Sequence, residues 1–199
     1  MSMWELLDNP VIWELSRVSL DLAFGLYRKR IQVMKSWNVL QDSPSVLDIG
    51  CGIGQYAKIT NSKYLGVDLN KAYLNYACKR HQQPHHSFKY ISVSDLVETH
   101  KQSFDLVLMV DLLHHLSEEQ CVLLLSTAKR LAKKHILSFE PVTFQPSPIG
   151  QWIVEHDRGS HVRSLERLHQ LFKDAQLGIT KSIELPLGPI NTRAILCQP

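Results

Sequence analysis

The sequence has few cysteines, little net charge and no long apolar run, and each of these absences excludes a class of protein. Its four cysteines form no CxxC pair, so we expect buried thiols in a reducing compartment rather than a disulfide framework. A formal net charge of +3 is too small to indicate nucleic acid as a partner. No apolar stretch reaches membrane-spanning length, and Glu5 and Asp8 interrupt the segment where a signal peptide would be apolar. We therefore expect a cytoplasmic protein with no membrane partner.

The remaining composition is that of an ordinary globular protein. The chain has 199 residues, of which 44% are hydrophobic and 21% are charged, and this length suits one domain with a sizeable core. We find no internal repeat and no low-complexity segment. The sequence predicts N-terminal helices over residues 1–42 and a single main domain over residues 43–199.

The N-terminal segment, residues 3–37, carries apolar residues at helical spacing. Asn9-Pro10 is expected to divide it, because the residue before a proline avoids the α region. Two interpretations stay open: the helices pack on a sheet, or they form a cap over a ligand pocket. The basic run Arg28-Lys29-Arg30 is interpreted as a solvated face.

The most informative stretch runs from Val46 to Gly54. Its apolar start predicts a buried strand over 45–49, and three glycines then follow on alternate positions. Glycine allows a sharp turn and lets a ligand approach main-chain N–H groups. The residues after Gly54 are expected to open a short helix, so the stretch predicts a nucleotide-type cofactor site. The spacing is G-x-G-x-G, whereas a dinucleotide site needs G-x-G-x-x-G, and this argues against a dehydrogenase.

Because Asp48 also stands two residues before Gly50, the stretch resembles motif I of class I S-adenosylmethionine (SAM) methyltransferases. The alternative is a glycine loop with no ligand. The resemblance covers about residues 43–199 and implies a class I methyltransferase domain there, with SAM as its cofactor. It implies an α/β, Rossmann-like doubly wound fold whose seven-stranded, mostly parallel sheet has the order 3-2-1-4-5-7-6 and an antiparallel last strand. The expected strands are 45–49, 64–68, 88–93, 104–110, 135–139, 179–185 and 192–197, and the expected helices of the domain are 71–82, 118–132 and 165–176.

Two further acids resemble the later cofactor motifs of this family. Asp68 ends a strand 20 residues after Asp48, where a carboxylate can accept hydrogen bonds from both ribose hydroxyls. Asp95 stands where an acid of the family meets the adenine amino group, although it could instead cap a short helix. The resemblance implies this set of cofactor-binding residues: Asp48, Gly50, Cys51, Gly52, Gln55, Asp68, Leu69, Asp95, Leu96 and Val110.

The strand over 104–110 is followed by a candidate base. The pattern from Asp111 to His115-Leu116 resembles that of phosphobase and glycine-type N-methyltransferases, in which the histidine lies near the methyl acceptor. Histidine is the natural general base at neutral pH. Because neighbours on a strand point to opposite faces, we expect only one of the pair to face the pocket, and we favour His115 over His114. The alternative is a histidine that only hydrogen-bonds to the next helix.

Residues 141–163 are expected to form a long irregular segment, since prolines interrupt it and no periodicity is evident. Its charged cluster weakly resembles a D-R-G-x-x-V-R segment of small bacterial methyltransferases. A substrate loop and a plain surface loop both remain open. If the segment is a substrate loop, Arg158 and Arg163 would bind an anionic acceptor. A cationic acceptor would instead be bound by Asp111 and Glu140. The expected substrate residues are Asp111, Glu140, Trp152, Asp157, Arg158, His161 and Arg163.

Several subclasses of methyltransferase are not indicated. The sequence lacks the [DNS]-P-P-[YFW] motif, and Glu140-Pro141 stands where metal-assisted enzymes would have Asp-Asn. His85 and His86 have no nearby acid or cysteine to complete a metal site, so no metal is expected. The sequence predicts methyl transfer from SAM to oxygen or nitrogen of a small-molecule or sugar-like acceptor. An RNA or protein methyltransferase and a non-catalytic SAM-binding protein remain as alternatives.

Overall fold

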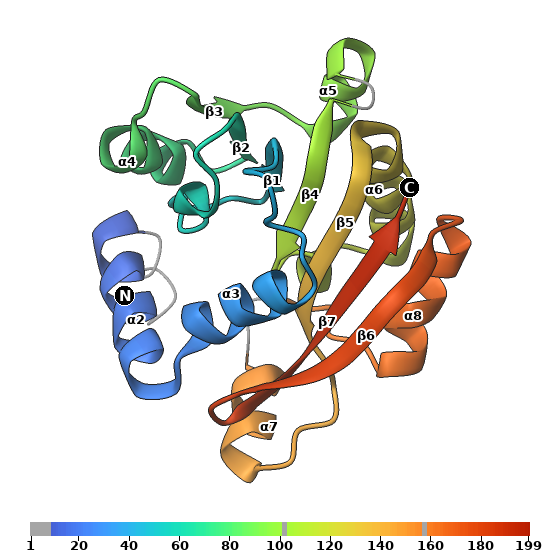
Figure 1. The fold of residues 1–199 in the computed structure, drawn as a ribbon. Helices are drawn as coiled ribbons and strands as arrows, with labels where there is room; N and C mark the ends of the chain where they lie inside the picture. The colour runs from blue at the N-terminus through green and yellow to red at the C-terminus, as the bar shows by residue number, and fades with distance from the viewer. Residues whose placement is uncertain (1–8, 101–102, 157–158) are drawn as a thin grey trace.

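The structure, a computed structural model, describes residues 9–100, 103–156 and 159–199 (Figure 1). Its centre is a seven-stranded sheet of order β3-β2-β1-β4-β5-β7-β6, which confirms the predicted order. The five strands from β3 to β5 are parallel, and β7 is antiparallel to both of its neighbours. The strands are β1 (Val46–Ile49), β2 (Tyr64–Asp68), β3 (His86–Tyr90), β4 (Phe104–Val110), β5 (Ala132–Pro141), β6 (Gly178–Leu187) and β7 (Ile190–Gln198).

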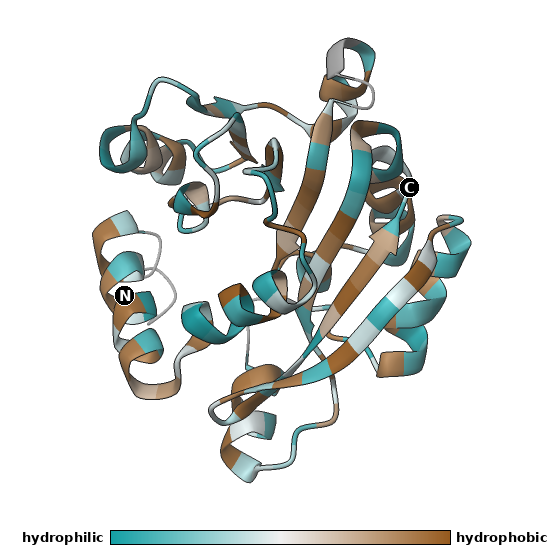
Figure 2. Cartoon of the chain, in the orientation of Figure 1, coloured by the Kyte–Doolittle hydropathy of each residue, from teal (hydrophilic) through white to brown (hydrophobic). Residues whose placement is uncertain are grey.

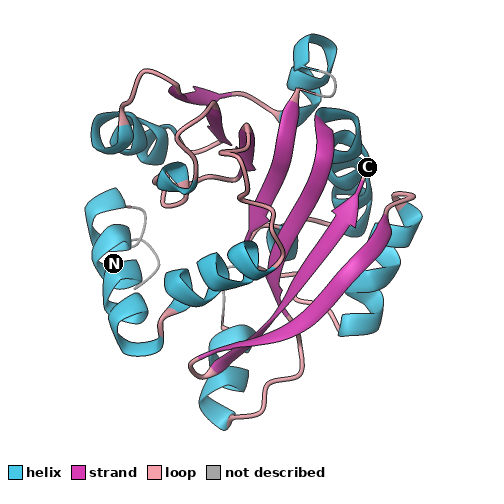
Figure 3. Cartoon of the chain, in the orientation of Figure 1, coloured by secondary structure: helices cyan, strands magenta, loops and turns pink. Residues whose placement is uncertain are grey.

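Helices cover both faces of this sheet (Figure 3), and the central strands are therefore mostly apolar, with polar bands such as that of Asp105 on β4 (Figure 2). On β4, Val107 and Met109 belong to one hydrophobic core, while Leu106 and Leu108 belong to the other. The first core is closed by α5 (Val93–His100), α6 (Glu118–Leu131) and α8 (Leu165–Asp174). The second is closed by α3 (Leu26–Ser36). The alternation of side chains along each strand thus anchors helices on the two faces.

The N-terminal helices reach across the sheet from one side to the other. Asn9 caps α2 (Pro10–Phe24) by accepting a hydrogen bond from the N–H of Val11. Asn9-Pro10 marks the start of α2, and the residues before it lie outside the described residues. A further break follows at Gly25, with φ +69°. At one end α2 lies beside α4 (Lys71–His81) (Figure 1). At the other end, Lys29 of α3 donates to the main-chain oxygen of Pro186 on β6.

The short helix expected after Gly54 is the three-residue 3-10 helix η1 (Ala57–Ile59). Two other local predictions are wrong for identifiable reasons. Segment 141–163 contains α7 (Pro148–Glu155), which Ser147 caps and a proline begins, so the proline that suggested a loop is a helix start. Strand β3 covers 86–90 rather than 88–93, because the segment that follows turns into α5. In contrast, the helix expected from residue 118 is confirmed as α6, which a capping box of Ser117 and Gln120 starts.

The cysteines are free thiols. Cys51, Cys121 and Cys197 are buried as expected, but Cys78 is exposed on the outer side of α4. Within the described ranges, no helix is long and apolar enough to cross a bilayer.

The contact of α7 with the β6–β7 turn gives a test of the fold. A Cβ atom on Gly150 would lie 1.9 Å from the main-chain oxygen of Pro189. Both partners are backbone, so Gly150→Ala must displace α7 from the turn, and we expect it to lower the free energy of unfolding by roughly 1–3 kcal/mol. Gly178→Ala is the matched control, since no atom lies within 4 Å of its added Cβ. Urea unfolding of both variants measures the difference, and equal stabilities would contradict the packing.

Candidate active site

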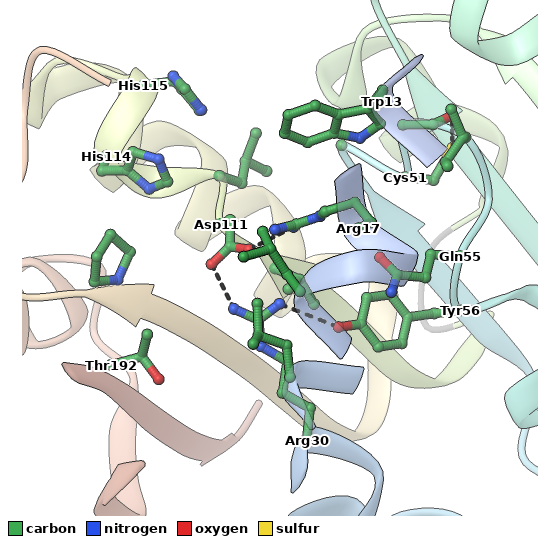
Figure 4. A pocket seen from close by; sticks show the side chains of 18 of the residues that line it. Trp13, Arg17, Arg30, Cys51, Gln55, Tyr56, Asp111, His114, His115 and Thr192 are labelled. Atoms are coloured by element: carbon green, nitrogen blue, oxygen red, sulfur yellow. Dashed lines mark hydrogen bonds and ion pairs between the residues drawn. The ribbon is translucent and has the colours of Figure 1, made fainter. Parts of the chain in front are cut away.

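A cavity of about 800 Å³ lies at the carboxyl ends of the parallel strands (Figure 4). It is bounded by the glycine turn after β1, the end of β4, the helices α2, α3 and α7, and the β6–β7 hairpin. This is the usual place for a ligand in an open parallel sheet. The residues predicted from the sequence that line it are Asp48, Gly50, Cys51, Gly52, Gln55, Asp68, Val110, Asp111, His114 and His115.

The glycine turn provides a cavity wall without side chains. Gly50, Gly52 and Gly54 all have positive φ, at 71°, 53° and 77°, a region that other residues rarely adopt. A Cβ on Gly50 would also lie 2.8 Å from a methyl carbon of Leu112. The turn therefore requires glycine for both its backbone conformation and its close packing.

The main-chain N–H groups of this turn are used within the protein. Those of Gly50 and Cys51 donate to the carbonyl oxygen of Val67, and that of Gly52 donates to Asp68 at 2.8 Å. In the structure these three N–H groups are therefore directed at β2. The turn brings the Asp68 carboxylate to the cavity wall.

Asp48 lies buried at the floor of the cavity, where it accepts a 2.5 Å hydrogen bond from the hydroxyl of Tyr64. Burial raises the pKa of Asp48 to about 7, the bond from Tyr64 acts to lower it, and the charge of Asp68 adds to the rise. Near neutral pH this carboxyl group is therefore divided between its two protonation states.

The other residues that were predicted to bind the cofactor do not all line the cavity. Asp68 accepts a second bond from the N–H of Asn70, at 2.7 Å, and Asn70 caps α4 as predicted. Leu69 is 68% exposed and does not line the cavity. Asp95 lies in the first turn of α5, where Ser92 donates to it, and Leu96 is buried in the core. Neither of these last two residues borders the cavity, and the position of Asp95 agrees with a role in starting a short helix.

The N-terminal helices bring two cations into the cavity. Arg30, from α3, is only 2% exposed and donates to Asp111 at 2.7 Å and to the hydroxyl of Tyr56 at 3.3 Å (Figure 4). Arg17, from α2, donates to the other oxygen of Asp111 at 2.8 Å and lies over the ring of Trp13. The interpretation of Arg28-Lys29-Arg30 as a solvated face is wrong for Arg30. Its spacing with Leu26, Val33 and Met34 on one helical face was the overlooked signal.

These contacts determine the ionisation state of the Asp111 carboxyl group. Although burial acts to raise it, the guanidinium groups of Arg30 and Arg17 hold the pKa of Asp111 well below its usual range. The carboxylate also raises the pKa of Arg30, against the lowering effect of burial. Because Asp111 is held by two cations, it does not serve as the predicted binder of a cationic acceptor.

Both histidines line the cavity, because the chain turns directly after β4 instead of continuing as a strand. His114 and His115 lie in the 3-10 turn η2 (Leu113–His115), with ring centroids 4.2 Å apart. The alternation of a strand, from which we expected only one of the two histidines to face the cavity, does not apply there. Glu140 is 1% exposed and accepts hydrogen bonds from main-chain N–H groups of η2 and from Nδ1 of His114. Its predicted contact with an acceptor is therefore wrong.

Most of the predicted acceptor residues in segment 141–163 lie away from the cavity. Trp152 is 55% exposed and stacks on His156, while its helix neighbours Ile153 and Val154 line the cavity. Arg163 is buried and donates to the main-chain oxygens of Leu113 and Leu116.

Through these hydrogen bonds Arg163 holds η2 in place, and its guanidinium group does not bind an anionic acceptor. His161 donates only its main-chain N–H, to the oxygen of His114. Asp157 and Arg158 lie outside the described residues. Residues 9–100, 103–156 and 159–199 contain no cluster of three His, Cys, Asp or Glu side chains that could hold a metal ion.

The wall opposite the glycine turn is apolar, and sequence patterns did not reveal it. Its residues come from helices and a hairpin that are far apart in the chain, so no local spacing marks them. They are Leu20, Leu26, Ile153, Val154, Leu187 and Ile190.

The sheet order, the antiparallel β7 and the glycine turn after β1 together define the class I methyltransferase fold. Residues 46–135, from β1 into β5, match the family model described as a methyltransferase domain. The match agrees with the resemblance carried by Asp48 to Gly54. Residues 46–135 therefore carry a methyltransferase domain, and the fold around them is that of SAM-dependent methyltransferases of known structure.

Solved structures share this fold at low sequence identity. Magnesium protoporphyrin IX methyltransferase from Synechocystis PCC 6803, with bound S-adenosylhomocysteine (SAH), has a TM-score of 0.65 and 17% identity over 86% of this chain and 82% of that chain. A SAM-dependent methyltransferase from Methanosarcina mazei has a TM-score of 0.67 and 20% identity, over 81% and 94%. Geranyl diphosphate C-methyltransferase from Streptomyces coelicolor A3(2) has a TM-score of 0.65 and 14% identity, over 85% and 78%. No curated protein sequence matches the chain.

The raised pKa of Asp48 predicts how stability depends on pH. An unfolded aspartate ionises near pH 4, so between about pH 4 and pH 7 the folded state binds more protons than the unfolded state. The free energy of unfolding therefore falls as pH rises through this window. Asp48→Asn removes the ionisation and keeps an acceptor for Tyr64, so the variant should be more stable than the wild type at pH 8, by up to about 4 kcal/mol.

Urea unfolding of the ligand-free protein between pH 4 and pH 8 measures this difference, which should vanish at the acidic end. Asp174→Asn, at the end of α8, is the control and should show no such trend. A stability difference that stays constant with pH would contradict the assignment.

Proposed function

We propose that the protein transfers a methyl group from SAM to oxygen or nitrogen of a small-molecule acceptor, with a histidine of η2 taking up the proton. The supporting observation is one cavity with the glycine turn and Asp68 at one end, an apolar wall at the other, and His114 and His115 at its side. Figure 4 shows the two histidines across the cavity from Gln55 and Tyr56. The sequence favoured His115, and the choice between the two is taken up below.

The polar end of the cavity fits SAM. The Asp68 carboxylate, at the end of β2, can accept hydrogen bonds from the ribose hydroxyls in addition to those from the backbone. The guanidinium groups of Arg17 and Arg30 are suitable partners for the carboxylate of SAM. The acid Asp48 also lines this cavity. Asp95 and Leu96 remain predictions from motif resemblance alone.

The apolar wall supports an acceptor with an apolar portion in preference to a sugar-like one, which would need more polar partners. The similar structures described above include enzymes named for magnesium protoporphyrin IX and for geranyl diphosphate, and both compounds are small molecules. We propose that residues 1–42 act as a cap over the main domain, residues 43–199, since α2 and α3 supply part of the cavity lining. The roles of Asp157 and Arg158 in acceptor binding stay predictions.

Methyl transfer needs alignment, exclusion of water and a place for a proton. When bound, SAM supplies an electrophilic methyl group on sulfur. The residues of α2, α3 and α7 enclose the acceptor end, which favours alignment and excludes water. A histidine of η2 then accepts the proton of the attacking oxygen or nitrogen.

Asp68→Ala tests the cofactor end. The change leaves the ribose hydroxyls without their acceptor and the glycine turn without its bond to Asp68, so we expect affinity for SAM to fall by roughly 1–3 kcal/mol while the fold persists. Calorimetric titration with SAM and SAH measures the effect, with the exposed Asp174→Ala as the control. Unchanged affinity together with a collapsed melting temperature would make Asp68 purely structural.

Transfer itself is tested with SAM that carries a labelled methyl group, incubated with fractionated metabolite extracts. We expect label in a small-molecule fraction and SAH formation that depends on that fraction. Label in RNA or protein would support those alternatives. SAM binding without acceptor-dependent SAH formation would indicate a non-catalytic SAM-binding protein.

A further inference from the structure

Glu140 is a buried carboxylate surrounded by N–H groups. Its Oε1 accepts from the main-chain N–H groups of Leu112 at 3.0 Å and Leu113 at 2.9 Å. Its Oε2 lies 3.3 Å from the main-chain N of His114 and 2.9 Å from Nδ1 of the same residue. Three of the four contacts are obligate donors, and only Nδ1 of His114 could accept from a protonated carboxyl group. Hydrogen bonds from three N–H groups favour the charged form of a carboxylate. The geometry therefore fits an ionised Glu140.

This arrangement fixes where His114 carries its proton. An ionised carboxylate can only accept, so Nδ1 of His114 must donate to it. A neutral imidazole has one N–H, and Nε2 is then the deprotonated nitrogen. His114 lines the cavity, and a buried acid thus sets its basic nitrogen. A third group that orients a base is the arrangement seen in other enzymes with a histidine base.

We propose that Glu140 is a positioning residue that acts through His114, and that His114 rather than His115 is the base of the reaction. This inference rests on the proposed function. In the transfer, the acceptor's oxygen or nitrogen forms a bond to the methyl carbon, and the carbon–sulfur bond breaks with its electron pair on sulfur. The acceptor's proton passes to Nε2 of His114, and the resulting imidazolium lies against the Glu140 carboxylate.

Glu140→Gln reverses the tautomer without changing the size of the side chain. The Gln oxygen must face Leu112 and Leu113, because the opposite orientation would set its NH2 group against two N–H donors. Its NH2 group then faces Nδ1 of His114 and donates to it, which places the ring proton on Nε2. A histidine of this tautomer cannot accept the acceptor's proton.

The first measurement needs no acceptor. Nitrogen NMR of the imidazole rings in the SAH-bound protein reports which ring nitrogen carries the proton. We expect the wild-type His114 to be protonated on Nδ1 and the Glu140→Gln variant on Nε2. Glu184→Gln, the same substitution on the edge strand β6, should leave the His114 tautomer as in the wild type. An unchanged His114 tautomer in Glu140→Gln would overturn the inference.

The second measurement uses the acceptor found by the metabolite screen. Glu140→Gln should lower kcat by roughly 10²–10⁴-fold and leave the KM for SAM near its wild-type value. Glu184→Gln should turn over at the wild-type rate. A Glu140→Gln variant with reversed tautomer but full kcat would overturn the inference, since the orientation of His114 would then not matter for transfer.

A third comparison remains valid if Glu140→Gln fails to fold. His114→Asn keeps an NH2 donor toward Glu140 and should lower kcat by a similar factor with SAM binding retained. Loss of activity in His115→Asn but not in His114→Asn would overturn the choice of base. A wild-type protein that transfers methyl to no acceptor contradicts the proposed function instead, while the tautomer measurement still decides whether Glu140 orients His114.

Discussion

The cavity depends on one carboxylate, that of Asp111, which binds two guanidinium groups from outside the sheet. Arg30 and Arg17 precede it by 81 and 94 residues, so this contact joins the N-terminal helices to the end of β4. Each partner is at least partly buried, and removing the Asp111 carboxylate would leave two guanidinium groups without this anion, which is more costly than never having formed the ion pairs. The helices that carry the arginines also supply Trp13 and Leu20 to the cavity wall.

The same residue marks the point where the sheet ends and the proposed chemistry begins. Asp111 has a φ of +52°, a conformation that costs energy for any residue with a side chain and that persists only when neighbours enforce it. The two arginines hold its side chain on one side, and Glu140 holds the next N–H groups on the other. Together they turn the chain out of β4 into η2, so that two consecutive histidines reach one cavity instead of opposite faces.

Local features of the sequence predicted local structure well. The apolar runs predicted β2 and β4 with their correct ends, the helix expected from residue 118 is α6, and the three glycines form the sharp turn that their spacing predicted. The sheet order came from family resemblance. The predictions that failed concern residues whose partners are distant in sequence. Arg30 looked solvated because Asp111 is 81 residues away. Glu140 looked like a ligand for an acceptor because its partners, in and just before η2, precede it by 26 to 28 residues. A charge can be located from sequence, but its partner cannot.

The attachment of the N-terminal helices has a consequence for the order in which the chain folds. Lys29 binds a residue 157 positions later, and Phe24 lies against Gly188 in the last turn of the sheet. During synthesis the first helices therefore emerge long before their partners exist, with apolar side chains still uncovered. Contacts of such long sequence separation form slowly, because the intervening chain must be ordered first. The cavity wall that α2 and α3 supply can therefore take its final position only after β6 and β7 have been synthesised.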